Sequence, residues 1–502
     1  MFAQGSIRIA VAPVLAALFL AAPVAAQWSA DPTANLAISG VATSIQVPSM
    51  AAAPDGGFYA SWTGPDLRVQ RLDANGHLLW PQDGVRIGDP QHDPASFEGV
   101  TRVVADAAGN AWIAYDCCAR QPAGSGYVAL HKVLPDGSAA WAPQGIAVPG
   151  SDGSSRVSAI AATSDDAVVV VWNGASGLLA QKIGSDGIAR WRAGGIRIND
   201  TYAPADVVAT QGGGVALAWM VSARSPVELD YALLAQRFAG SDGAALWNGG
   251  SPVPVLGPEA HIGVGEIASL IADGGGVVIA ADRVSVSDTY VGAYLPRVQH
   301  LDGTGAPLLG ANGVAATTAN EVGTSRGLSA SSFDATKGDI YMVWPESAPK
   351  PSSSRNGVFA QRIDAAGQRA WGDAGKALVA PVGGTDFGRS VPEVVALPLA
   401  GGFLASWITG EYFVDEHRVT VARIDSDGSY AWPSRTVDIR TGGLAVELTG
   451  AISTSGFAAY AWDNSDLKSA PAWISAQDIG FDGVFGVPHA PTDPVFSDGF
   501  DG

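Results

Sequence analysis

Acidic side chains gather in the segments that interrupt an otherwise repetitive and apolar sequence. These segments are 115–127, 220–231, 281–290, 344–357 and 407–417. Two carboxyl groups about 5 to 9.5 Å apart can cleave a glycosidic bond, so a pair among them could act as acid and base. Because the chain has 48 acidic residues, solvated surface acids are the simpler interpretation. The acidic candidates for a ligand-binding face are Asp116, Glu228, Asp230, Asp282, Asp288, Glu346, Glu411, Asp415 and Asp463, with Glu416 beside them.

Two adjacent cysteines, Cys117 and Cys118, lie in the first of these segments and are the only cysteines of the chain. In an oxidising compartment they could form a disulfide between neighbouring residues, which would stiffen the loop, or could pair between chains. An enzyme that uses cysteines for disulfide exchange more often has Cys-x-x-Cys. We therefore expect a structural role for Cys117 and Cys118, as part of the same ligand-binding face.

The remaining chemistry-bearing residues form no metal or phosphate pattern. The seven histidines are scattered singly, and no glycine loop has the spacing that holds phosphates. The recurrent Asp-x-x-Gly turns offer one or two carboxylates each, whereas calcium prefers six or more oxygen ligands. We therefore assign no catalytic residue and no metal ligand, and expect no cofactor, with calcium and pyrroloquinoline quinone as the alternatives.

The irregular segments separate copies of a repeated unit, so the repeat must position them. Its clearest element is an extended run, an Asp-x-x-Gly turn and a Trp, as in VQRLDANGHLLW (69–80). Six copies of this element end at Trp80, Trp141, Trp191, Trp247, Trp371 and Trp432. Two decayed copies lie near Leu309 and Phe485, which brings the total to eight.

A second element precedes each of these copies. It is a β-branched and aromatic run behind a Gly-rich turn, which is typical of a β-strand. One copy lacks the Trp and ends near Asp282, and the others contain Trp62, Trp112, Trp172, Trp219, Trp344, Trp407 and Trp462. Since the tryptophans recur at fixed places within apolar alternation, we expect them to pack between repeats rather than to stack on a ligand.

Each unit of about 50 to 62 residues therefore contains about four short strands, and such a sheet needs neighbours to bury both faces. The sequence predicts an all-β, eight-bladed β-propeller of four-stranded antiparallel blades over residues 27–487, since a closed ring removes exposed edges. The segment from Trp28 to about Ile45 resembles the end of a repeat, and the last copy lacks one. We expect the N-terminal segment to complete the last blade; an open solenoid is the alternative.

The first residues indicate export. Arg8 precedes an apolar run over 9–26 that ends in small residues, which is typical of a signal peptide cleaved after Ala26. A retained membrane anchor is the alternative; otherwise we expect no stable membrane span. Loss of Arg8 would change the formal net charge from −19 to −20. Such an acidic surface disfavours nucleic acid and suits basic or neutral partners.

The Gln-Arg-x-Asp-x-x-Gly-x-x-x-Trp unit resembles a repeat of secreted bacterial propellers of undefined function. It is carried by Gln70, Arg71, Asp73, Gly76 and Trp80 and again around Trp371. The adjacent cysteines and Trp-ending repeats also resemble, more weakly, quinoprotein alcohol dehydrogenases, which implies a bound pyrroloquinoline quinone and calcium. Here Asn-Gly or Asp-Gly replaces that family's typical Thr-Gly. Residues 488–502 form a tail whose FSDGFD resembles the Phe-x-Asp-Gly-Phe-acid tail of xanthomonad-type exported proteins.

These observations predict an exported, monomeric, non-catalytic propeller in the periplasm, at the cell surface or outside the cell. It would bind a glycan or a protein ligand through its loop-rich face, because function on a repetitive scaffold usually lies in the variable loops. The alternative is an enzyme, either a carbohydrate-cleaving propeller or a quinoprotein-like dehydrogenase.

Overall fold

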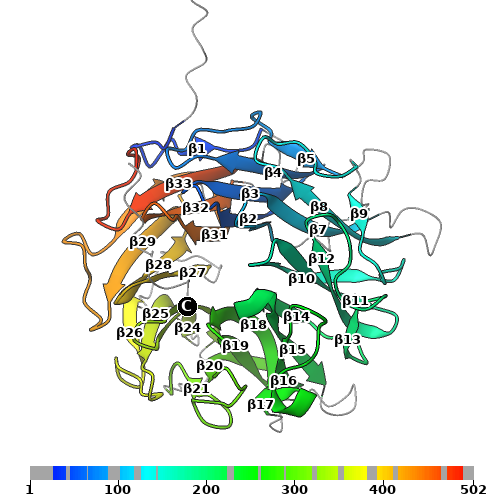
Figure 1. Cartoon of the computed structure of the whole chain (residues 1–502). Coiled ribbons are helices and arrows are strands. Elements are labelled where there is room, and N and C mark those ends of the chain that lie inside the picture. The colour runs from blue at the N-terminus through cyan, green and yellow to red at the C-terminus, as the bar shows by residue number, and fades with distance from the viewer. Residues whose placement is uncertain are drawn as a thin grey trace, which may run out of the picture.

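The chain forms a ring of eight β-sheet blades around a central channel (Figure 1). The computed structural model describes residues 27–40, 46–64, 66–88, 102–117, 126–142, 145–222, 231–257, 262–287, 290–318, 325–348, 355–380, 393–410, 416–464 and 472–489. The prediction of an all-β, eight-bladed propeller is therefore confirmed. The expected signal peptide, most of the expected tail and several candidate residues lie outside these ranges.

Each blade is an antiparallel sheet whose first strand lines the channel and whose last strand lies outermost. Blade 1 contains β2 (Gln46–Ala52), β3 (Phe58–Thr63), β4 (Leu67–Leu72) and β5 (Val85–Ile87). Blade 2 contains β6 (Val104–Ala105), β7 (Ala111–Cys117), β8 (Tyr127–Val133) and β9 (Ile146–Ala147). Blade 3 contains β10 (Arg156–Thr163), β11 (Ala167–Gly174), β12 (Gly177–Gly184) and β13 (Ile196–Asn199). Blade 4 contains β14 (Ala205–Ala209), β15 (Val215–Ser222), β16 (Tyr231–Phe238) and β17 (Val253–Leu256).

The second half of the ring repeats this order. Blade 5 contains β18 (Ile262–Asp273), β19 (Gly276–Ser287), β20 (Tyr290–Leu301) and β21 (Val314–Ala315). In blade 6, β22 (Ser325–Arg326) and β23 (Ala330–Asp334) both pair with β24 (Asp339–Ala348), followed by β25 (Arg355–Ile363) and β26 (Lys376–Val379). Blade 7 contains β27 (Val394–Leu399), β28 (Gly402–Thr409), β29 (Arg418–Asp425) and β30 (Val437–Thr441).

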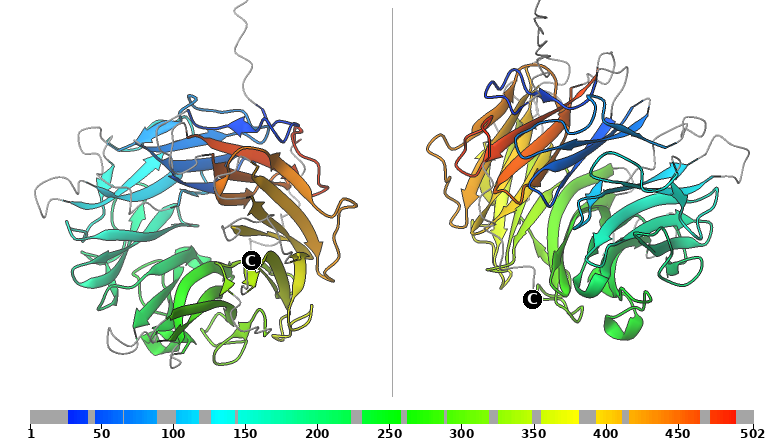
Figure 2. Two further views of the ribbon diagram at one scale, coloured as in Figure 1. Left: turned by 180° about the vertical axis from the view of Figure 1, so that it is seen from behind. Right: turned by 45° about the horizontal axis from the view of Figure 1, so that its top comes forward.

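Blade 8 joins the two ends of the described chain. It contains β31 (Val446–Ile452), β32 (Phe457–Asp463), β33 (Ile474–Gly480) and, as its outer strand, β1 (Leu36–Ala37). The pairing brings the blue and red ends of the ribbon side by side in all views (Figures 1 and 2). The Gln477 side-chain amide also donates to the backbone carbonyl of Ser29, at 2.8 Å. The N-terminal segment thus closes the ring, as the repeat pattern predicts.

Helix is nearly absent from the described part of the chain. It is limited there to two short 3₁₀ segments, η2 (Gln211–Gly213) and η3 (Asn248–Gly250). In the same residues, no helix is long and apolar enough to cross a bilayer.

The hydrophobic core is divided among the interfaces between blades. Side chains alternate along every strand, so each sheet sends one set of apolar residues toward each neighbouring blade. Trp62, Trp172 and Trp219 near the ends of second strands are at most 3% exposed. In blade 2 the strand register places Tyr115, and not Trp112, at the equivalent position, because Ala111 pairs with Val133 as Phe58 pairs with Leu72.

A second ring of tryptophans joins the turns on the opposite face. Each indole lies against the Asp-x-x-Gly turn of the next blade, and Trp80 Nε1 donates to the Pro135 carbonyl at 3.1 Å. Trp28 takes this place between blades 8 and 1, where Nε1 donates to the Ala74 carbonyl at 2.9 Å. A Cβ at Gly76, whose φ is +80°, would lie 2.7 Å from the Trp28 backbone nitrogen. The glycine therefore provides both the turn and the space for the indole.

Candidate functional site

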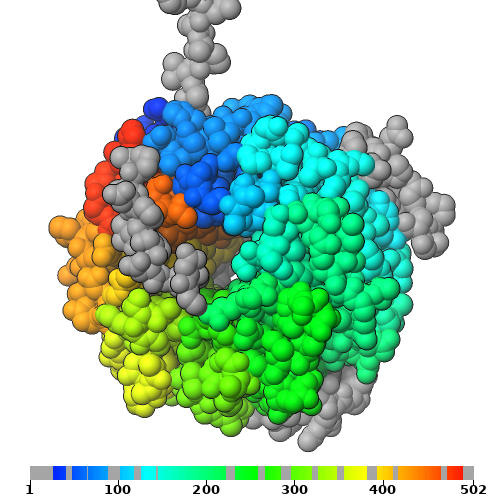
Figure 3. All heavy atoms as spheres, in the orientation of Figure 1, coloured from blue at the N-terminus to red at the C-terminus, as the bar shows by residue number. Residues whose placement is uncertain are grey.

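The second strand of each blade ends on the same face of the ring as the first strand of the next blade begins. The irregular sequence segments connect strands at this end, and we call it the loop-bearing face. Side chains of the second strands show this arrangement, because three of them form hydrogen bonds with the beginning of the neighbouring blade. This face contains one mouth of the central channel, and the centre of the ring is hollow in the space-filling view (Figure 3).

Two of the carboxylates singled out in the sequence connect neighbouring blades at this face. Asp116 Oδ1 accepts the backbone N–H of Val157 at 2.7 Å, and Asp282 Oδ2 accepts that of Ser329 at 2.9 Å. At the equivalent position of blade 3, Asn173 Oδ1 accepts the N–H of Ala203 at 2.9 Å. Asp116, Asn173 and Asp282 each follow the residue that corresponds to Trp62 of blade 1, which is Ala281 in blade 5. A side chain at this position thus connects one blade to the beginning of the next.

Burial disfavours the ionised form of both connecting carboxylates. Asp116 is 8% exposed and Asp282 is fully buried. Burial raises the pKa of each to about 6, against the lowering effect of the accepted hydrogen bond. For Asp282, the nearby carboxyl group of Glu266, its cross-strand partner, raises the pKa further.

The other described candidates lie in different blades. Glu346 forms an ion pair with Arg326, with Oε2 3.0 Å from Nε, and Asp463 is fully buried at the end of β32. Cys117 ends β7, is 2% exposed and is disulfide-bonded. Glu416 is exposed and forms a parallel bridge with Gly443. The candidates Cys118, Glu228, Asp230, Asp288, Glu411 and Asp415 lie outside the described residues, so their part in a ligand-binding face stays a prediction.

The central channel itself contains a cavity of about 900 Å³. Its wall contains the first strands of blades 1 to 5, the ends of β3 and β15, Leu67 at the beginning of β4 and Thr449 of blade 8. Many of the lining side chains are small, such as Ala51, Ala159 and Ala161. This small-residue wall leaves the volume open.

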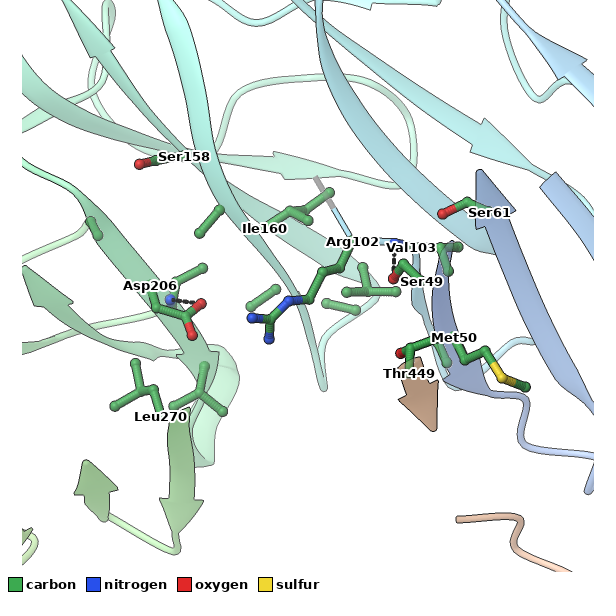
Figure 4. A pocket seen from close by; sticks show the side chains of 18 of the residues that line it. Ser49, Met50, Ser61, Arg102, Val103, Ser158, Ile160, Asp206, Leu270 and Thr449 are labelled. Atoms are coloured by element: carbon green, nitrogen blue, oxygen red, sulfur yellow. Dashed lines mark hydrogen bonds between the residues drawn. The ribbon is translucent and has the colours of Figure 1, made fainter. Parts of the chain in front are cut away.

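Three charged side chains line the cavity: Arg102, Asp206 and Glu266. The Arg102 guanidinium and the Asp206 carboxylate point toward the same part of it (Figure 4). Asp206 pairs with Ala218 across the sheet, just as Ser49 pairs with Ser61, so these residues lie at one level of the channel.

Enclosure in the channel and the positive charge of Arg102 act on Glu266 in opposite directions. Desolvation, the larger effect, raises its pKa, and the guanidinium of Arg102 lowers it. Asp206 Oδ1 accepts the backbone N–H of Val207 at 2.8 Å. The cavity therefore combines one cation with two carboxyl groups in a wall of small side chains.

Our sequence reasoning missed these three residues because it searched the connecting loops and treated the inner strands as uniform. The signal was present, since each is a charged residue within or directly before an apolar inner-strand run: Arg102 before VVADA, Asp206 in ADVVA and Glu266 in GEIASL. A charge at a position where other repeats have Ala, Ser or Val indicates a side chain that faces water or a ligand.

The described residues do not provide the metal site that the quinoprotein resemblance implies. No group of three or more His, Cys, Asp or Glu side chains converges among them. Asp116, beside Cys117, is engaged with the Val157 N–H. The calcium and quinone alternative therefore stays a prediction.

The similarity of this chain to the solved structures below concerns the fold alone. No family model and no curated protein matches it. The Dos1 propeller is similar over 89% of this chain and 94% of its own, with 11% identity and a TM-score of 0.46. The polysaccharide lyase Uly1 is similar over 91% and 94%, with 9% identity and a TM-score of 0.42.

Prolyl oligopeptidase B from Galerina marginata is similar over 84% of this chain, with 11% identity and a TM-score of 0.41. The similarity spans only 55% of that enzyme's length. Because all three TM-scores are below 0.5, these likenesses do not bear on what this chain binds or catalyses.

Proposed function

We propose that this protein is an exported, non-catalytic propeller that binds a glycan or a protein ligand at the loop-bearing mouth of its central channel. One observation carries the proposal: a cavity of about 900 Å³ opens among small side chains and contains Arg102, Asp206 and Glu266. Binding sites are typically concave, with a few charged or polar groups that fix the orientation of the ligand.

The carboxyl groups of Asp116, Asp282 and Glu346 do not supply an acid and a base in the cavity. Asp116 and Asp282 accept backbone hydrogen bonds from neighbouring blades, and Glu346 pairs with Arg326. Asp116 and Asp282 connect neighbouring blades, Glu346 pairs within blade 6, and none of the three lines the cavity. A carbohydrate-cleaving propeller would need two carboxyl groups free to act on one bond. Among the described residues of the cavity, Asp206 and Glu266 are the pair on which this alternative would depend.

The proposal is tested by closing the channel. Ser158 lines the cavity (labelled in Figure 4), so the large side chain of Ser158→Trp would occupy part of its mouth. Ala139 is exposed in a turn at the opposite face, and Ala139→Trp is the matched control. Purified protein and both variants are screened on glycan and peptide arrays, with thermal melting to check the fold.

We expect ligands of the unmodified protein to bind at least tenfold more weakly to Ser158→Trp and equally well to Ala139→Trp. A ligand whose affinity is unchanged by Ser158→Trp would show that the binding site lies elsewhere. Conversion of a bound glycan into products would replace this proposal with the enzyme alternative.

A further inference from the structure

The channel wall presents strand edges rather than strand faces. Consecutive residues of two inner strands line the cavity, over 158–162 in blade 3 and 204–209 in blade 4. In sheet order, β10 and β14 each pair with one neighbour, β11 and β15 respectively, and stand at the inner end of their sheets. Every second N–H and C=O of such a strand points away from its partner and therefore toward the channel. In β14 one of these groups, the Val207 N–H, is bonded to Asp206 Oδ1, so a ligand would use the others or displace this bond.

A free strand edge is a binding surface for an extended polypeptide, because backbone groups of the ligand can continue the sheet. A glycan would more commonly use aromatic faces. Trp62 is the one aromatic residue in the described lining of this cavity. The wall therefore favours a peptide backbone over a sugar ring.

The charges of the cavity indicate which side chains such a peptide would carry. Among the described residues, no ion pair involves Arg102, Asp206 or Glu266. A negative group of a ligand would be attracted to Arg102, and a positive group to Asp206 and Glu266. A group of like charge would be repelled at each place. The formal net charge of −19 also attracts a basic segment from solution.

We propose that the ligand is an extended segment of polypeptide with one basic and one acidic side chain, bound along the inner strands of blades 3 and 4. The basic side chain lies against Asp206 and Glu266, and the acidic side chain against Arg102. This inference rests on the proposed function and selects a protein ligand from its two classes.

The test uses two sets of four acetylated and amidated eight-residue peptides of Ser and Thr. Their two variable positions carry Lys and Glu, Lys and Gln, Gln and Glu, or Gln and Gln. One set places these positions two residues apart and a second set four apart, since both spacings keep the side chains on one face of an extended chain. Affinities are measured by isothermal titration calorimetry at low salt.

We expect the Lys–Glu peptide to bind at least tenfold more tightly than the Gln–Gln peptide. Asp206→Asn and Glu266→Gln should remove the preference for Lys, and Arg102→Gln the preference for Glu, while Arg102→Lys keeps part of it. Each loss is selective for one charge, which a general folding defect would not produce.

Equal affinities for the four peptides, or no binding by any of them, would overturn the inference. A glycan that binds in a manner sensitive to Ser158→Trp would also overturn it and would leave the proposed channel site intact. Absence of any ligand sensitive to Ser158→Trp would overturn both.

Discussion

Replacing the buried carboxyl group of Asp282 by an amide should change how stability depends on pH. Asn keeps an oxygen that can accept the Ser329 N–H, as Asn173 does for Ala203 in blade 3. What disappears is an ionisable group that is fully buried and has a pKa of about 6. The Asp282→Asn variant therefore isolates the cost of the charge from the loss of the hydrogen bond.

The direction follows from proton linkage. The folded-state pKa lies above the unfolded value of 3.8, so the folded protein binds the proton more tightly. The stabilisation by the proton on the Asp282 carboxyl group is complete below about pH 4, and it is lost as the pH rises through 6. Since one pKa unit corresponds to about 1.4 kcal/mol, Asp282 should lower the free energy of unfolding by about 2 kcal/mol between pH 4.5 and 7.5.

The assay is denaturant unfolding, followed by tryptophan fluorescence, at a series of pH values. The difference in the free energy of unfolding between Asp282→Asn and the unmodified protein should increase by about 2 kcal/mol, in favour of the variant, from pH 4.5 to 7.5. Asp200→Asn is the matched control, because its side chain is 84% exposed. Parallel pH profiles for Asp282→Asn and the unmodified protein would refute the reasoning, and would show that the carboxyl group is not desolvated in the folded ring.

Two further predictions concern the contacts between blades. Trp28→Ala removes an indole that is 5% exposed and donates to Ala74, so it should lower the free energy of unfolding by about 3 to 5 kcal/mol. Stability within 1 kcal/mol of the unmodified protein in a denaturant titration would contradict ring closure by this residue. Gly305→Ala and Gly310→Ala both place a side chain at positive φ, but the new Cβ at position 305 would lie 2.7 Å from Trp247, whereas position 310 is open. Thermal melting should show Gly305→Ala as the more destabilised of the two, and equal melting temperatures would exclude a tight indole contact.

The architecture could be predicted from the sequence because every repeat carries the same local signals. Strand alternation, Asp-x-x-Gly turns and a recurrent Trp predict eight four-stranded units. The segment from Trp28 to about Ile45, which resembles the end of a repeat, predicts how the ring is closed. One register detail was not accessible. Trp112 and Tyr115 are both aromatic, and only the pairing of Ala111 with Val133 shows which of them occupies the position of Trp62.

The site was less predictable, because its chemistry depends on contacts between distant parts of the chain. Asp116 meets a backbone N–H that lies 41 residues further along the sequence. No local pattern distinguishes this buried acceptor from a carboxylate that faces solvent. Conversely, Arg102 and Asp206 are 104 positions apart in the sequence. They point into the same cavity because blades 2 and 4, with blade 3 between them, surround one channel.

Closure of blade 8 by β1 also determines when the fold can be completed. β1 can pair with β33 only after β33 has been synthesised. Ser29 and Gln477, which form a hydrogen bond at this seam, are separated by 448 positions. Bringing such distant ends together costs about 5 kcal/mol of chain entropy, whereas each inner hairpin closes over a few residues. Seven blades can therefore form in order along the nascent chain, and the seam should be both the last contact made and the first one released on unfolding.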